Sequence, residues 1–461
     1  MTDFCPYYPK PHKTKSSLFF RFFRGLSSWI DVLFEKSYSM KMGHVKQFGL
    51  DLYMVNEPEI IKRILIDEAE HFPKHALMHN MLKDLLGDSV FTTNGDVWKH
   101  QREILNHAFT TAKVSRLFPQ MKDSVDTMIS RISEFMLSNK EDYLEVDSEM
   151  THITADIIFR AILSKSLEKS DSHEIYNAFI EYQDLSQKMV TMKLFKIPLW
   201  RFYKRGVLAS AKKIRNFILK IIDERLAKSE KAEKAESSIH DMLDVIMNNA
   251  DSNDKKFSRE ELLDQINMLF LAGHETSAAS LAWSIYLIAN SDEIQNNLYL
   301  EIKEHFGSGE IDQQGLSKLK YTQSVFNESL RLFPPVSFFL RESMVDQMIG
   351  DKHVKKGSVI VISPWLMHRH RKIWIKPDTF CPSRFVEKKE KSAINHAYLP
   401  FSKGPRTCPG AGFATQEGVL ILASIVKHFK IQPHPDHVPI PSAKVTLRAK
   451  NCIKVKFIAR F

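Results

Sequence analysis

The sequence has little cysteine, no long apolar run and no internal repeat. Its four cysteines among 461 residues, Cys5, Cys381, Cys408 and Cys452, have no CxxC spacing. This excludes a disulfide framework and a regularly spaced zinc cluster, and it suits a reducing compartment. One reactive thiolate or one metal-ligating cysteine stays possible. The absence of a repeat of about 20 to 50 residues excludes solenoids and propellers.

Nucleotide-binding and hydrolase motifs are also missing. There is no P-loop and no G-x-S-x-G elbow. His274-Glu275 starts like a zincin motif, but Ala278 stands where the second histidine ligand belongs. Gly410-Ala-Gly412 starts like a dinucleotide fingerprint without its third glycine. The chain therefore shows no zincin site and no nucleotide-binding module of its own.

Acidic residues are outnumbered by basic ones, 55 against 65, which gives a net charge of +10. A basic protein first suggests a nucleic acid or an anionic membrane as partner. The charge is diffuse, however, and no zinc-finger, RNP or basic-zipper pattern occurs. We therefore expect no nucleic-acid partner. The excess basic residues are expected to form a solvated surface or a docking face for an acidic protein.

Residues 1–40 form an N-terminal extension, which we separate from a domain over residues 41–461. Residues 18–34 are too short and too charged for a membrane span of about 20 residues. Helical spacing within them gives one apolar face, made of Phe19, Phe22, Phe23, Leu26, Ile30 and Leu33. Two interpretations stay open: a helix packed on the edge of the domain, or a peripheral anchor with Arg21 and Arg24 at lipid head groups.

Helical patterns fill the middle of the chain. The capping box Ser258-Arg-Glu-Glu261 opens an apolar pattern that predicts one long helix to about Ala289. Short strands are predicted within residues 45–55 and 354–363. The fold class is therefore mainly α with small β-sheets, and no alternating βαβ array is seen.

The most informative segment is residues 401–410, FSKGPRTCPG. An axial thiolate for haem iron needs a rigidly held cysteine whose anion is stabilised by backbone N–H groups. Gly404 permits a turn that a side chain would block. Because a proline follows Cys408, we expect Gly410 and Ala411 to be the donors. A structural cysteine beside a turn is the alternative.

This segment resembles the signature F-x-x-G-x-R-x-C-x-G of the cytochrome P-450 family of haem-thiolate monooxygenases. The resemblance implies a single large domain that binds haem b. It makes Cys408 the iron ligand and Arg406 a partner of a haem propionate, with Phe401 covering the sulfur and Gly410 beside it.

A further motif agrees with the family's order along the chain. Glu328-Ser-Leu-Arg331 matches E-x-x-R, whose spacing places both side chains on one helix face. By resemblance, Arg384 completes their buried ion-pair network, although Ser383 replaces the family's usual glutamate. Taken alone, such a pair is usually a surface contact.

Arginines that resemble the family's propionate partners lie elsewhere in the chain. Trp98-Lys-His-Gln-Arg102 matches W-x-x-x-R, and Arg341 follows the Pro-Pro turn where the family places another arginine. Together with Arg406, they are expected to neutralise two buried carboxylates.

Ala272-Gly-His-Glu275-Thr276-Ser falls in the middle of the long predicted helix and matches the family's A-G-x-[DE]-T-[ST]. The resemblance makes Glu275 and Thr276 the catalytic acid-alcohol pair, in which Thr276 holds dioxygen and Glu275 relays protons. A helix-interior threonine that bonds its own backbone is the alternative for Thr276.

The resemblance also implies a set of substrate-pocket positions. They are mostly apolar here, which predicts a lipophilic substrate such as a fatty acid, a terpenoid or a sterol-like molecule. Each position is individually also a candidate for core packing. The set comprises Leu77, Met78, Met81, Leu82, Leu85, Phe91, Phe270, Ala272, Val336, Phe338 and Phe339.

The resemblance implies hydroxylation or epoxidation with O₂ and with electrons from a separate ferredoxin, flavodoxin or flavoprotein reductase. Basic residues such as Lys403 are expected to help dock that acidic donor. The expected location is cytoplasmic, with peripheral membrane contact through residues 18–34 left open. Two alternatives remain: an enzyme that uses or rearranges peroxides, and a haem-free helical binding protein.

Overall fold

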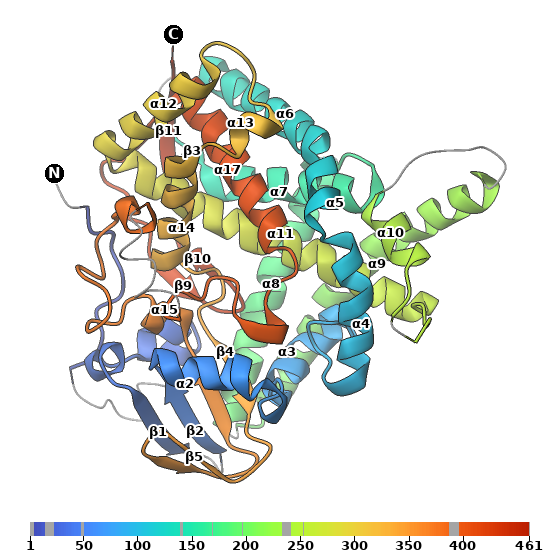
Figure 1. Ribbon diagram of the computed structural model, residues 1–461, viewed down its shortest axis with the longest axis vertical. Helices are drawn as coiled ribbons and strands as arrows, with labels where there is room; N and C mark the ends of the chain where they lie inside the picture. Colours follow the sequence, from blue (N-terminus) through green and yellow to red (C-terminus); the bar gives the residue numbers. More distant parts are fainter. Residues whose placement is uncertain are drawn as a thin grey trace.

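The computed structural model describes residues 4–13, 23–47, 50–138, 142–167, 169–195, 197–232, 241–251, 253–386 and 396–460, and it is mainly helical with small sheets (Figure 1). The helices and helical turns are η1 Trp29–Val32, η2 Glu35–Tyr38, α2 Pro58–Lys62, η3 Arg63–Asp67, η4 Ala69–His71, α3 Ala76–Leu86, α4 Gly95–Ala108, α5 Thr111–Arg116, α6 Phe118–Ser138, α7 Val146–Leu163, α8 Lys169–Leu194, α9 Trp200–Ala232, α10 Met242–Asn248, α11 Arg259–Ala289, α12 Asp292–Phe306, α13 Gln313–Leu316, α14 Lys320–Leu332, α15 Pro364–Met367, η5 Pro382–Phe385, η6 Gly404–Arg406 and α17 Ala411–His428.

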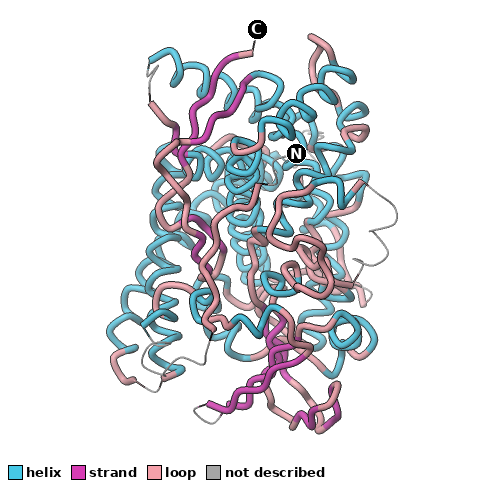
Figure 2. Tube along the Cα trace, turned by 90° about the vertical axis from the view of Figure 1, so that its left-hand side faces the viewer, coloured by secondary structure: helices cyan, strands magenta, loops and turns pink. Residues whose placement is uncertain are grey.

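The strands are short and form four small sheets. They are β1 Met42–Gln47, β2 Leu50–Val55, β3 Leu144–Glu145, β4 Phe339–Glu342, β5 Gln347–Ile349, β6 Lys352–Val354, β7 Val359–Ile362, β8 Phe429–Pro433, β9 Pro441–Ala443, β10 Leu447–Ala449 and β11 Lys454–Ala459. The largest sheet has the order β1-β2-β7-β4, in which only β2 and β7 run parallel. Figure 2 shows strands at the lower end of the molecule and a second group near the C-terminus. The strands predicted within residues 45–55 and 354–363 are confirmed.

Helix α11 is the central element of the helical body. It begins at the predicted capping box, where Ser258 and Glu261 bond each other's backbone, and its 31 residues make it about 45 Å long. It packs against α7, α14 and α17, and most of its side chains are buried. A Cβ at Gly273 would lie 2.7 Å from Ile158 Cγ1 on α7, so glycine is required for this close packing. The predicted helix over residues 258–289 is confirmed.

The N-terminal extension packs on the body wherever the structure describes it. Residues 23–25 are helical, but residues 26–28 form a turn, so the single amphipathic helix predicted to continue to residue 34 is wrong. The interruption has a tertiary cause. Ser28 Oγ accepts the Ala443 N–H at 2.9 Å, and the Gly25 carbonyl accepts Gln187 Nε2 at 2.6 Å. The Ser27 carbonyl also accepts from Ser442 Oγ at 3.1 Å, so β9 and α8 provide partners for the backbone of this stretch.

The apolar residues that follow this turn are buried. Ile30 and Leu33 are 3% and 5% exposed, which supports edge packing for this part of the segment. Phe19, Arg21 and Phe22 lie outside the described residues, and the division between residues 1–40 and 41–461 stays a prediction. Within the described ranges, every helix is too short or too polar to cross a membrane.

Candidate active site

The loop before α17 holds Cys408 in a backbone conformation that few sequences allow. Gly404 has φ +71°, and a Cβ there would lie 1.9 Å from the Leu65 carbonyl oxygen of η3. Ser402 also has a positive φ, of +60°. The Cys408 N–H donates to the Phe401 carbonyl at 2.9 Å and closes the loop. Position 404 therefore requires glycine, because η3 approaches it closely. The turn that it forms is rigid, and Cys408 lies directly after this turn.

Cys408 is exposed, and the groups around it shift the pKa of its thiol. The residue is exposed, yet the dense protein around it raises the pKa of its thiol. The Gly410 N–H, which bonds the sulfur, and the Arg102 guanidinium oppose that rise. A structural cysteine would have its sulfur packed against side chains. An exposed cysteine whose sulfur accepts a backbone N–H is suited to ligate a metal as thiolate.

Arg102, Arg341 and Arg406 lie close together beside this cysteine, although they come from three separate parts of the chain. Arg406 stacks on the Trp98 ring of α4, with its guanidinium carbon 3.6 Å from the ring centre. Arg102, one turn further along α4, donates to the Thr407 carbonyl at 2.6 Å. Burial, with Arg341 and Arg102 nearby, lowers the pKa of Arg406 to about 9. Burial likewise lowers the pKa of Arg341 to about 10.

Lys74 joins this group and was not predicted from the sequence. Its Nζ donates to the carbonyls of Val90, Phe91 and Thr93, at 2.6, 2.7 and 3.4 Å. Burial, then repulsion from Arg406 and the other two arginines, lowers its pKa well below the usual value. Its backbone also exchanges two hydrogen bonds with the Asn94 side chain, which in turn accepts from Arg406. Lys74 thus organises the loop on which Arg406 rests.

The partners recorded for these four cations in the described chain are carbonyl and amide oxygens, and no carboxylate offsets their repulsion. Clustered, desolvated cations of this kind fit a group that brings its own negative charges. Haem b carries two propionates, and its iron takes a cysteine thiolate as axial ligand. The residues present therefore fit haem, with Cys408 as ligand and the cation cluster as propionate partner.

Thr276 and Glu275 lie in the middle of α11, and their side chains have different surroundings. Thr276 is half-buried, and its hydroxyl donates to the Ala272 carbonyl at 2.8 Å, as a threonine inside a helix often does. Glu275 is 1% exposed and accepts two hydrogen bonds from Arg448 of β10, at 2.7 and 2.6 Å. The carboxylate is therefore held in a bidentate ion pair with the C-terminal hairpin.

The Glu328 network is fully internal. Arg331 donates to both carboxylate oxygens of Glu328, at 2.7 and 2.8 Å, and both side chains are fully buried. Arg384 of η5 approaches the same carboxylate at 3.4 Å. Arg331 also donates to the carbonyls of His368, Pro377 and Thr379. This pair is thus not a surface contact, and it joins α14 to the segment that leads to the cysteine loop.

The candidate pocket residues divide into two groups. Met81, Leu82, Leu85 and Phe270 are at most 9% exposed and pack in the main core, so the structure favours core packing for them. The others are half-buried or exposed: Leu77, Met78, Phe91, Ala272, Val336, Phe338 and Phe339. The Lys74 ammonium lies over the Phe91 ring, 5.8 Å from its centre.

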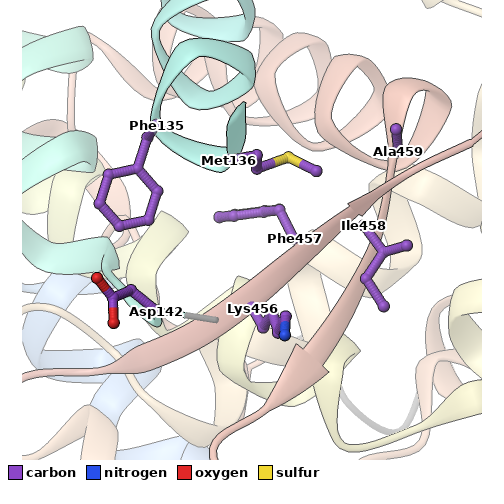
Figure 3. Close-up of a pocket in the computed structure, with 7 residues that line it drawn as sticks. All are labelled: Phe135, Met136, Asp142, Lys456, Phe457, Ile458 and Ala459. Atoms are coloured by element: carbon purple, nitrogen blue, oxygen red, sulfur yellow. The ribbon is translucent and has the colours of Figure 1, made fainter. Parts of the chain in front are cut away.

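A cavity lies elsewhere, between the C-terminal part of α6 and β11 (Figure 3). It contains none of the candidate site residues. Its lining is Phe135, Met136, Asp142, Lys456, Phe457, Ile458 and Ala459.

Lys74 and Arg448 are the main functional candidates that the sequence did not indicate. Neither belongs to a motif with fixed spacing. Lys74 contacts a loop 16 to 19 residues further on, and Arg448 lies 173 residues from Glu275. The motif arginines indicated a group of buried cations, but no pattern in the sequence singled out Lys74 or Arg448.

Comparison with known proteins identifies the family of the chain. The family model of cytochrome P-450 matches residues 27–457. The protein LUTEIN DEFICIENT 5, chloroplastic, of Arabidopsis thaliana is 27% identical over 400 residues, which cover 84% of this chain and 66% of that protein. An Arabidopsis cytokinin hydroxylase is 28% identical over 427 residues (89% and 81%), and cytochrome P-450 4V2 of Mus musculus is 26% identical over 432 residues (89% and 80%).

A match over residues 27–457 leaves only the two ends of the chain outside the family model. The mainly helical fold and the cysteine loop with its cations are consistent with that match. This chain belongs to the cytochrome P-450 family of haem-thiolate monooxygenases.

Proposed function

We propose that this protein is a monooxygenase that oxidises a lipophilic small molecule, with Cys408 as the haem ligand. The single observation that carries the proposal is the exposed Cys408 beside four cations that have no carboxylate partner in the described part of the chain. When bound, haem supplies the redox-active iron that activates O₂. Arg102, Arg341 and Arg406 bind and orient its propionates, while the Gly410 N–H stabilises the thiolate.

The distal residues handle oxygen and protons. The Thr276 hydroxyl rotates from the Ala272 carbonyl to hold dioxygen or a water molecule, and Glu275 supplies protons once its carboxylate is free. Glycine at position 273 allows α11 to pack closely against α7, so the backbone of α11 is held rigidly next to Glu275 and Thr276. Positioning and proton supply are thus the contribution of the chain to catalysis.

An apolar substrate is supported by the residues that keep accessible surface near α11. Ala272, Val336 and Phe338 are half-buried and carbon-rich. On α11, the Glu275 carboxylate is paired with Arg448 and the Thr276 hydroxyl bonds the Ala272 carbonyl, which supports an apolar substrate. The curated relatives include a cytokinin hydroxylase and an 11-oxo-beta-amyrin 30-oxidase, so their names indicate different substrates.

The function is tested on the purified haem protein. We expect the reduced carbon-monoxide complex to show the red-shifted Soret band of a thiolate ligand, and lipophilic compounds to shift the haem spin state. Turnover of a compound found in this screen is then compared with a reductase system and with hydrogen peroxide. Product formed only with peroxide would favour the peroxide-using alternative, and a missing band would contradict the proposal.

Electron donors are expected to dock on the basic surface beside the cysteine loop. Lys403 lies in that loop, and α5, which carries Lys113 and Arg116, packs next to α17. Opposite charges accelerate association more at low salt, because the Debye length falls to about 10 Å at 0.1 M. We expect turnover with an acidic donor protein to slow by roughly tenfold between low and high ionic strength. Turnover that is insensitive to salt would contradict this docking face.

Lys74 is expected to influence haem retention through the loop that it orders. In K74M the carbonyls of Val90, Phe91 and Thr93 lose their charged donor. The loop that contains Thr93 becomes less ordered, and Arg406, which donates to the Thr93 carbonyl, is held less firmly. Charge-assisted hydrogen bonds contribute about 1.5–3 kcal/mol each, so haem dissociation should accelerate by roughly tenfold or more. Transfer of haem to excess apomyoglobin measures this rate.

The matched control for this prediction is K83M. Lys83 lies in the neighbouring helix α3 and forms an exposed ion pair with Asp88. Exposed pairs contribute little, so K83M should release haem at the parental rate. If K74M also kept that rate, Lys74 would have no role in holding the cofactor.

A further inference from the structure

A single buried histidine connects the helix of the Glu328 network to the segment that leads into the cysteine loop. His368 follows α15 directly and is fully buried. Its Nδ1 lies 3.1 Å from the Arg331 carbonyl at the end of α14, and its Nε2 accepts the Leu399 N–H at 2.8 Å. Arg331 also donates to the His368 carbonyl at 2.7 Å. One side chain therefore joins two segments that are distant in the chain.

Both hydrogen bonds require the neutral imidazole in one tautomer. A backbone N–H can only donate, so the Nε2 atom that accepts it carries no proton, and Nδ1–H donates to the Arg331 carbonyl. Burial, followed by the charge of Arg331, lowers the pKa of His368 to about 3. The imidazole is therefore uncharged at neutral pH and serves as donor and acceptor at once.

Both backbone groups that His368 binds depend on it. The Arg331 carbonyl lies in the last turn of α14, and the residues three and four positions further on, Pro334 and Pro335, have no N–H to donate. Leu399 lies outside the helices and strands and is 1% exposed, so its N–H is shielded from water. A buried backbone group without a partner costs about as much free energy as a lost hydrogen bond. His368 removes this cost at both positions.

From Leu399 the contacts continue to the cysteine. The Leu399 carbonyl accepts the Ser402 N–H at 3.2 Å, which closes a tight turn around Phe401. The Phe401 carbonyl accepts the Cys408 N–H at 2.9 Å and the Thr407 hydroxyl at 3.3 Å. Because this turn is short, the position of Leu399 determines where the Phe401 carbonyl lies, and that carbonyl in turn fixes the backbone of the cysteine.

We propose that His368 is a positioning residue that holds the start of the cysteine loop on α14 and thereby sets the position of Cys408. This inference rests on the proposed role of Cys408 as haem ligand. The Tyr398 hydroxyl also bonds α14, through the Asn327 carbonyl at 2.8 Å, but that contact is made by a side chain and gives the Leu399 N–H no partner. The hydrogen bond to His368 is the one that holds the backbone of the loop.

The variants H368L and H368Q test this role. Leucine offers no donor or acceptor, whereas glutamine carries both on one planar group. In H368L we expect the amides of Leu399 and Ser402 to exchange with deuterium about tenfold faster than in the parent protein. We also expect the reduced carbon-monoxide complex to lose its red-shifted band several-fold faster, because a loosely held cysteine loses the Gly410 N–H that stabilises its thiolate. H368Q should stay within about twofold of the parent in both measurements.

The matched control is H370L. His370 is also buried, at 3% exposed, but its Nδ1 accepts the Lys372 N–H two residues further on, so this hydrogen bond stays within its own segment. Loss of a buried histidine is expected to lower the melting temperature of both leucine variants, and circular dichroism measures this. H370L should nevertheless keep the parental exchange of the Leu399 amide and the parental lifetime of the band.

Three outcomes would overturn the inference. Unchanged Leu399 exchange in H368L would show that His368 does not hold the loop. Equal loss of the band in H368L and H370L would show that His368 only stabilises the fold, and equal loss in H368Q and H368L would show that its hydrogen bonds are not the cause. A missing band in the parent protein would instead contradict the proposed function, and it would leave the exchange result unaffected.

Discussion

Replacing Cys408 by alanine is expected to abolish the red-shifted Soret band of the reduced carbon-monoxide complex and all monooxygenase turnover. Cys408 is an exposed residue, and the Gly410 N–H bonds its sulfur. Alanine removes the thiolate that directs electron density to iron. The loop itself should persist, because it is closed by the backbone bond from the Cys408 N–H to the Phe401 carbonyl.

The spectrum of the purified C408A protein after haem reconstitution is the measurement. C5A is the matched control, since the exposed Cys5 sulfur makes only a 3.4 Å contact with the Thr379 hydroxyl. C5A should keep the band and the activity. A C408A protein that kept the band would show that another residue ligates the iron. Circular dichroism of both variants establishes that they are folded.

Replacing Glu328 by glutamine is expected to have the largest effect on stability in this chain. The carboxylate is the shared partner of Arg331 and Arg384, which are 0% and 5% exposed. Removing one partner of a buried pair leaves an uncompensated charge and costs about 3–5 kcal/mol. Folded proteins have a net stability of only about 5–15 kcal/mol, so E328Q should unfold or lose haem at markedly lower temperature.

Thermal unfolding followed by circular dichroism and by the Soret band measures this effect. E304Q changes an exposed glutamate on α12 and should melt with the parent. If E328Q also melted with the parent, the buried ion pair would not contribute to stability. Arg331 still has three carbonyl partners in E328Q, so a partial loss of stability rather than complete unfolding is compatible with the prediction.

The central helix and the cysteine loop were predictable from the sequence because their causes are local. The capping box at Ser258 and the apolar pattern after it define α11 within one segment. The three-residue spacing of Glu328 and Arg331 places them on one face of a helix. The cysteine loop is recognisable because residues 401–410 form one continuous motif, although the close approach of Leu65 to Gly404 is seen only in the structure. A few residues that are adjacent in the sequence are enough to predict each of these features.

The N-terminal segment shows where such local patterns fail. An apolar helical spacing over residues 18–34 predicted one helix, yet partners on β9 and α8 interrupt it at residues 26–28. Hydrogen bonds from distant elements compensate for the lost helical bonds, and the sequence of the segment itself carries no trace of those partners.

The sequence by itself determined the family, the cysteine, the long helix and the arginines that belong to motifs. Only the tertiary structure decided which charges meet. Lys74 was found because three carbonyls of a later loop surround its ammonium group, and Arg448 because it faces Glu275 across 173 residues. The physical reason is that ion pairs and hydrogen bonds depend on distance in space, whereas a sequence pattern records only spacing along the chain.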